Sequence, residues 1–66
     1  MEFVEKSRII LERWINHSDH HLEEYEAFAD ELEGAGKMES AKAVREMAEL
    51  TSKSTECLKR ALKVLG

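Results

Sequence analysis

The sequence predicts an all-α fold, an antiparallel two-helix hairpin that is expected to dimerise into a four-helix bundle. Three observations support this prediction. Proline is absent from the 66 residues, and the glycines lie only at positions 34, 36 and 66, so two long segments flank one break. Each segment repeats its apolar residues at the spacing of a helix. Charged residues make up 36% of the chain, enough to cover the outer faces of such helices.

The first predicted helix covers about residues 2–33. At about 100° per residue, its large apolar side chains fall within one arc, which is the stripe of an amphipathic helix. The arc contains Phe3, Val4, Ile10, Leu11, Trp14, Ile15, Leu22, Tyr25, Phe28, Ala29 and Leu32. A helix of this length, about 48 Å, is not stable in isolation, so it must pack against another element.

The segment ELEGAGKM, residues 31–38, ends this helix. Gly34 is expected to take the left-handed conformation at the helix end, and Gly36 is expected to let the chain reverse. A turn as short as 34–36 requires the next helix to return antiparallel to the first. Folding about residue 35 brings position i of the first helix opposite a position near 70 − i of the second.

The second predicted helix covers about residues 37–65, and its apolar face is built from smaller side chains. Alanines on this face permit a close approach to the first helix. The face contains Ala43, Val44, Met47, Ala48, Leu50, Thr51, Ser54, Thr55, Leu58, Ala61, Leu62 and Leu65. Because the arc of the first helix is wide enough for two neighbours, and a soluble monomer rarely leaves so large an apolar stripe bare, a two-fold dimer is the simplest way to cover it.

Charge and composition disfavour several classes of partner. Ten basic and fourteen acidic side chains give a net charge of −4, which opposes binding to nucleic acids and to anionic membranes. The chain has no apolar run approaching the roughly 20 residues of a membrane span, and it begins with acidic residues where a signal peptide needs basic ones. Cys57 is the only cysteine, which fits a reducing compartment. We therefore expect a cytoplasmic single-domain protein, residues 1–66, that forms a homodimer.

A polar layer is predicted at mid-length in both helices. All three histidines lie in the stretch WINHSDHHLEEY, residues 14–25. His17 and His21 form an i, i+4 pair on the interior side beside Ser18, whereas His20 points toward solvent. Hydroxyl side chains interrupt the apolar face of the second helix at the same height, at Thr51, Ser54 and Thr55.

Two interpretations of this layer remain open. In the first, the neutral imidazoles of His17 and His21 bind a divalent transition metal (nickel, cobalt or zinc), with Glu24 as a nearby carboxylate and a symmetry mate completing the coordination shell. In the second, the layer holds no metal, because hydroxyls and imidazoles satisfy one another and only fix the register of a structural or protein-interaction module.

The spacings argue against the better-known catalytic and metal motifs. A ferritin-like di-iron site needs Glu-x-x-His repeats, yet Trp14, His17 and Ser18 stand three residues before the histidines. A His-Glu-x-x-His metalloprotease needs glutamate where Ser18 stands, and the segment EGAGK lacks the spacing of a phosphate-binding loop. We therefore do not expect an enzyme.

The stretch from Trp14 to Val44 resembles an uncharacterised prokaryotic family of small helical hairpins. The first helix of that family carries Trp-x-x-His-x-x-x-His-x-x-x-Tyr, which Trp14, His17, His21 and Tyr25 match. Such hairpins are similar to a domain sometimes appended to small nickel-binding accessory proteins, so the resemblance implies nickel first among the metals. The family pattern has asparagine after the first histidine, where this chain has Ser18. The resemblance implies no activity.

Overall fold

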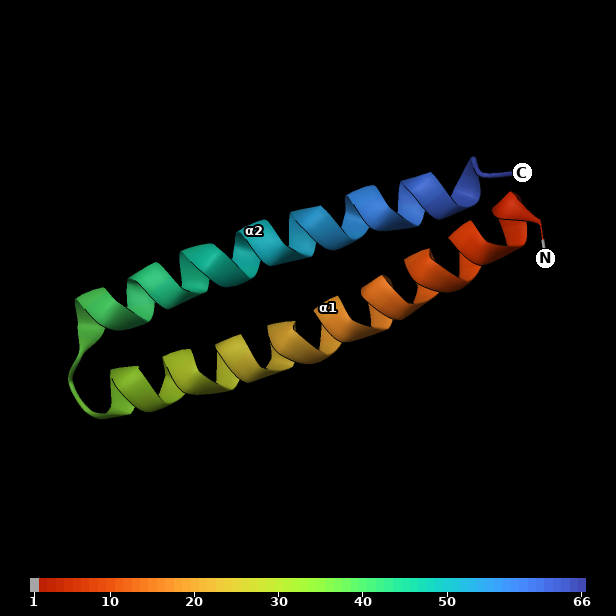
Figure 1. The fold of residues 1–66 in the computed structure, drawn as a ribbon. Helices are drawn as coiled ribbons and strands as arrows, with labels where there is room; N and C mark the ends of the chain where they lie inside the picture. Colours follow the sequence, from red (N-terminus) through yellow and green to blue (C-terminus); the bar gives the residue numbers. More distant parts are fainter. Residues whose placement is uncertain (1) are drawn as a thin grey trace.

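The structure is a hairpin of two long helices that lie side by side and run antiparallel (Figure 1). It is a computed structural model that describes residues 2–66, so residue 1 of the predicted domain 1–66 lies outside the described residues. Helix α1 spans Phe3–Gly34 and helix α2 spans Met38–Lys63. Both ends of the chain lie at one end of the molecule, and the turn lies at the other. The described residues contain no strand, which confirms the predicted all-α hairpin.

The two helices meet along a narrow line of side chains, which we call the seam. Seam residues follow one another at alternating intervals of three and four, the a/d spacing of a coiled coil. On α1 they are Leu11, Ile15, Ser18, Leu22, Tyr25, Ala29 and Leu32. On α2 they are Ala41, Val44, Ala48, Thr51, Thr55, Leu58 and Leu62, and Leu65 continues the same spacing just after the helix ends. The most deeply buried residues are all small, which allows the two helices to approach closely: Ala29, Ala41, Ala48 and Thr55.

One contact fixes the alignment of the two helices. Ser18 Oγ lies 2.6 Å from Thr55 Oγ1. Moving along both helices from this pair, the seam spacing sets Leu22 opposite Thr51 and Ile15 opposite Leu58. The sequence placed Ser18 near position 52, among the hydroxyl residues Thr51, Ser54 and Thr55, and its observed partner lies three residues beyond position 52.

The cause of this difference lies in the turn. Gly36, not Gly34, has the left-handed conformation, with φ of 80°, while Gly34 is the last residue of α1. The Gly36 amide donates to the Glu33 carbonyl at 3.0 Å and the Lys37 amide donates to the Leu32 carbonyl at 2.8 Å. These are the two hydrogen bonds of a Schellman motif with glycine at the C′ position. Because α1 continues through Gly34, the chain reverses later than predicted and the alignment shifts with it.

The flat hairpin has one largely apolar face and one charged face, on opposite sides of the seam. The groove face is formed by residues one position before a seam residue: Ile10, Trp14, His17, His21, Glu24, Phe28 and Glu31 of α1 with Ser40, Ala43, Met47, Leu50, Ser54, Cys57 and Ala61 of α2 and Val64 just after it. The charged face is formed by residues one position after a seam residue: Glu12, Asn16, Asp19, Glu23, Glu26, Asp30 and Glu33 of α1 with Lys42, Arg45, Glu49, Ser52, Glu56, Lys59 and Lys63 of α2.

The predicted apolar arcs are therefore divided between the seam and the groove face. Trp14 is 54% exposed, Phe28 52% and Leu50 65%, although the sequence predicts all three for the core. Small residues bring the helices so close that only the a/d positions fit between them, which leaves the neighbouring apolar side chains uncovered. Neither helix of the described chain combines the length and the low charge that crossing a bilayer requires.

Candidate functional site

The groove face is hollowed at mid-length, where the sequence predicts the polar layer. The hollow has a volume of about 350 Å³. Its lining consists of Trp14, His17, Ser18 and His21 with Tyr25, Thr51, Ser54 and Leu58. The four residues of the Trp-His-His-Tyr motif all belong to this lining, because spacings of three and four keep them on one side of α1.

Three side chains of α1 form a hydrogen-bonded row along the edge of this hollow. His17 Nε2 lies 2.9 Å from His21 Nε2, and His21 Nδ1 lies 2.8 Å from Glu24 Oε1. A helix produces this row directly, since residues three or four apart are neighbours on its surface. The two Nε2 atoms thus face each other, while Glu24 holds the opposite side of the His21 ring.

The row also fixes which nitrogens carry protons when both imidazoles are neutral. A carboxylate only accepts hydrogen bonds, so His21 Nδ1 carries the proton that it donates to Glu24 Oε1. His21 Nε2 then has a free lone pair and accepts from the Nε2 proton of His17. A metal ion at His21 Nε2 would need no change of tautomer there, whereas His17 would have to release its Nε2 proton.

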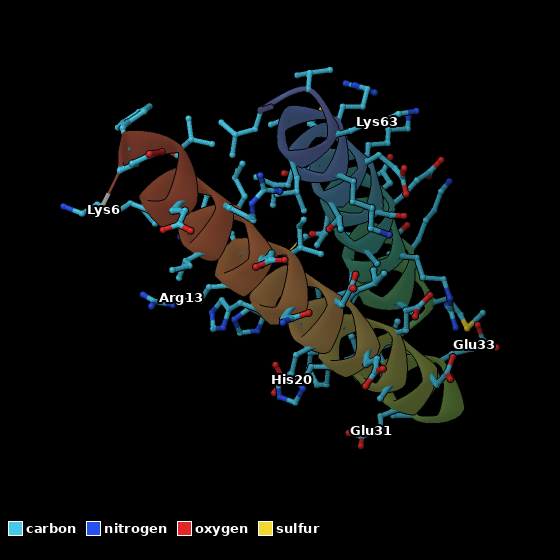
Figure 2. The ribbon with its side chains drawn as sticks, turned by 90° about the vertical axis from the view of Figure 1, so that its right-hand side faces the viewer. Lys6, Arg13, His20, Glu31, Glu33 and Lys63 are labelled. Carbon is cyan, nitrogen blue, oxygen red and sulfur yellow. The ribbon has the colours of Figure 1, made fainter. Side chains whose placement is uncertain are left out.

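Neighbouring rings hold the His21 imidazole in place. The Tyr25 ring is stacked on it at a centroid distance of 5.8 Å and an interplanar angle of 7°. The His17 ring meets it edge-on at 4.3 Å and 83°. His20 is on the outer side of α1 and points away from α2 (Figure 2), as the sequence predicts.

The hydroxyl half of the predicted layer forms a separate chain inside the seam. Thr55 Oγ1 donates to the Thr51 carbonyl at 3.0 Å, and because a hydroxyl has one proton, Ser18 Oγ donates to Thr55 Oγ1. Ser54 is exposed on the groove face and belongs to neither bond of this chain. The meeting of Ser18 with the hydroxyls of α2 confirms that both helices turn polar at the same height.

The histidines themselves lie beside the seam, not within it. His17 is exposed, and the His21 side chain is 39% exposed. The expectation that they face the interior of the hairpin is therefore wrong for the single chain. They stand one position before Ser18 and Leu22, outside the a/d positions that fit between the helices.

A single chain supplies only part of a coordination shell. Within residues 2–66, no group of three or more histidine, cysteine, aspartate or glutamate side chains is arranged to hold a metal ion. Glu24 contacts the Nδ1 side of His21 and so lies away from the Nε2 atoms. The hairpin therefore offers two imidazole nitrogens and one orienting carboxylate.

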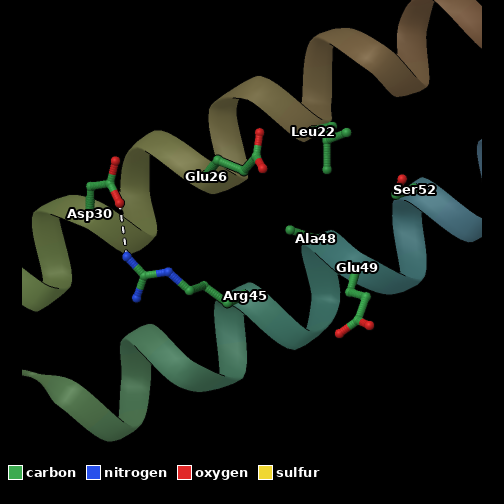
Figure 3. A pocket seen from close by; sticks show the side chains of 7 residues that line it. All are labelled: Leu22, Glu26, Asp30, Arg45, Ala48, Glu49 and Ser52. Atoms are coloured by element: carbon green, nitrogen blue, oxygen red, sulfur yellow. Dashed lines mark hydrogen bonds and ion pairs between the residues drawn. The ribbon is translucent and has the colours of Figure 1, made fainter.

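The charged face carries a second and larger hollow, of about 620 Å³, whose lining residues include an ion pair between the two helices (Figure 3). Arg45 bridges the two helices there, with one guanidinium nitrogen 2.8 Å from Asp30 Oδ1 and the other 3.0 Å from Glu33 Oε1. The basic group in this groove is thus already paired with carboxylates of the same chain.

Trp14 and Tyr25 line the hollow of the groove face, although the apolar arc of the first helix assigns both of them to a packed core. Their spacing on one side of α1 is equally compatible with a packed core, which is how aromatic residues in such a stripe are usually used. The two residues reach the groove from different positions. Tyr25 is a seam residue whose side chain extends into the groove, whereas Trp14 stands one position before the seam residue Ile15.

Comparison with known proteins assigns the chain to a family without a described activity. Residues 7–65 match the family model "Domain of unknown function (DUF8180)". No curated protein and no solved structure matches the chain.

Proposed function

Since the chain belongs to the DUF8180 family, whose description names no activity, we propose its function from the groove: it binds a divalent transition metal through His17 and His21 as a homodimeric helical hairpin. One observation carries the proposal, the pair of Nε2 atoms held 2.9 Å apart with Glu24 on the far side of His21. Metal-bound histidines almost always donate their second ring proton to such a partner.

The separation of the two nitrogens suits an ion placed between them. With metal–nitrogen bonds of about 2.0–2.1 Å, two ligands at a right angle are about 2.9 Å apart and two tetrahedral ligands about 3.4 Å apart. A change of about half an ångström in the side chains therefore covers both geometries. Imidazole suits zinc, nickel, cobalt and copper, and the resemblance of the Trp-His-His-Tyr motif favours nickel among them.

The homodimer is proposed because the single hairpin leaves too much surface exposed. A folded monomer of 7.6 kDa is expected to expose about 4,300 Å², whereas the hairpin exposes 5137 Å². The excess, roughly 800 Å², is the area that one partner of an interface of standard size buries. Six of the ten exposed large apolar residues lie on the groove face, so this is the face that a second chain would cover.

A metal-free role in assembly is the second candidate, and the exposed apolar side chains favour it. Trp14, Phe28 and Leu50 would serve a protein interface equally well without any ion. In that case the His17–His21 pair supplies only hydrogen bonds. Both candidates are binding functions, and we propose no catalytic role.

Metal titration separates these candidates. We expect saturable uptake of Ni²⁺, Co²⁺ or Zn²⁺ by calorimetry, with affinity lowered about 100-fold or more, about 2.8 kcal/mol, in His17→Ala and in His21→Ala. The matched control is His20→Ala, which removes a histidine that lies outside the row and should bind as the unaltered chain does. Uptake that is equal in all three variants would exclude this site.

Glu24→Gln tests the orienting role of the carboxylate. The amide cannot attract the His21 Nδ1 proton as strongly, so we expect metal affinity to fall about 10-fold to 100-fold while the helical content stays constant. Glu23→Gln is the control, because it removes the same charge from the neighbouring residue on the charged face. If both variants bind alike, the effect of Glu24 is only its general negative charge.

A further inference from the structure

Several apolar residues of the groove face are placed symmetrically about the level of the two histidines. The middle of α1, Phe3–Gly34, falls between Ser18 and Asp19, and the same level on α2 is Ser54. Ile10 and Phe28 lie nine residues before and after position 19, and Met47 and Ala61 lie seven residues before and after position 54. His17, His21 and Ser54 thus lie at the centre of this face, and apolar side chains lie on both sides of them; Glu24 and Glu31 add two carboxylates on the side of the turn.

This distribution fits a second copy laid antiparallel on the groove face. A two-fold axis perpendicular to the helices, crossing at the histidine level, would bring Ile10 of each copy to Phe28 of the other and superpose the two polar centres. It would also place large side chains of α2 against small ones, with Met47 of each copy near Ala61 of the other. Because the axis crosses the middle of α1, the two hairpins would overlap along their whole length.

The charges favour this arrangement over the parallel one. Residues 1–19 and 54–66, the half that contains the chain ends, carry six basic and five acidic side chains, a net charge of +1. Residues 20–53, the half that contains the turn, carry four basic and nine acidic side chains, a net charge of −5. Parallel stacking would set the two strongly acidic halves against each other, whereas antiparallel stacking separates them and sets each against the weakly basic half.

We infer that two copies pair antiparallel through their groove faces and share one metal ion between two His17–His21 pairs. This inference rests on the proposed metal-binding function. Two imidazoles leave a four-coordinate ion two ligands short, and the same axis that matches the apolar residues brings His17 of one copy to His21 of the other. Four imidazoles then complete the shell, and Glu24 of each copy orients one ring.

The arrangement is measured by pulsed electron paramagnetic resonance between spin labels. The label is attached at Ala35→Cys in the turn, in a Cys57→Ser background, so that neither label disturbs the groove face. In the antiparallel dimer the two turns lie at opposite ends, and the label distance should approach the 51 Å length of the hairpin. In a parallel dimer the turns adjoin, and the distance should be roughly 15–20 Å, the width of the bundle.

A label at Asp19→Cys in the same background is the matched control. Position 19 lies at the level of the axis, so its label distance should be about 20 Å in either arrangement and reports dimer formation alone. The number of ions per chain is measured on the unlabelled protein by native mass spectrometry after titration with Zn²⁺ and with Ni²⁺. For an antiparallel dimer with a shared ion, we expect the long distance between the turn labels together with one ion for every two chains.

Other results would exclude the shared site, and one of them would also exclude the proposed metal binding. A short distance between the turn labels, or one ion bound per chain, would overturn the shared site and leave the proposed metal binding intact. Failure of the protein to take up either ion would overturn both the proposed function and the shared site. A chain that stays monomeric with and without metal would overturn the shared site whatever its affinity for metal.

Discussion

Leu50→Glu is expected to convert the proposed dimer into monomers. Leu50 is 65% exposed on the groove face of the hairpin, so the substitution should leave the single chain folded. In the antiparallel dimer the new carboxylate would be buried without a partner against the second copy, and two-fold symmetry makes this cost apply twice. We expect the dissociation constant of the dimer to rise at least about 100-fold, about 2.8 kcal/mol.

Sedimentation velocity over a wide range of concentrations measures this effect. Ser52→Glu is the control, because it adds the same charge two residues away on the charged face, and it should associate as the unaltered chain does. Circular dichroism checks that both variants remain helical. Should the Leu50→Glu chain dimerise as strongly as the control, the groove face is not the dimer interface.

Ala29→Leu is expected to cause the largest loss of stability of any single change in the seam. Ala29 is fully buried in the seam, and the alignment places it opposite Val44. Inserting three carbon atoms there forces the helices apart, at a cost of about 1–3 kcal/mol. For a domain of this size, that corresponds to a fall in melting temperature of roughly 5–20 °C.

Ala27→Leu provides the matched comparison. It adds the same atoms two residues earlier at an exposed position, and leucine is nearly as good a helix former as alanine. Thermal melts followed by circular dichroism at one fixed protein concentration should separate the two variants, since dimer formation makes the melting temperature depend on concentration. Equal melting temperatures would mean that the seam is not tightly packed at Ala29.

Sequence periodicity predicted the two helices and their antiparallel return because both depend on local patterns. The alignment depends on where the first helix stops, and the sequence offers two glycines within three residues. Both Gly34 and Gly36 satisfy the rule that glycine follows a helix end, so the pattern alone does not choose between them. In the structure Gly36 is the left-handed residue, so the chain reverses later than predicted. Ser18 therefore contacts Thr55 instead of a residue near position 52.

The part of the candidate site that depends on one helix was predicted, whereas the part that depends on both helices was not. Helical spacing alone places His17, His21 and Glu24 in one row, because that row lies within a single helix. Whether the row faces the seam or its edge depends on how closely α1 and α2 approach, which the alanines of both helices decide together. A broad apolar arc on one helix does not show that small buried residues such as Ala29 and Ala48 let the helices approach so closely that only the a and d positions fit between them.

The hydroxyl pair in the seam has a consequence for how the hairpin avoids misfolding. A seam that repeats every seven residues could slide by one heptad and still bury apolar side chains. Such a slip would set Ser18 opposite Ala48 or Leu62 and remove the acceptor that Thr55 provides. Ser18 is half-buried, so losing this acceptor costs up to about 1–3 kcal/mol, the penalty of a buried hydroxyl without a partner. The Ser18–Thr55 contact therefore selects one alignment among otherwise similar ones, and it keeps the centre of the groove face at the middle of the molecule.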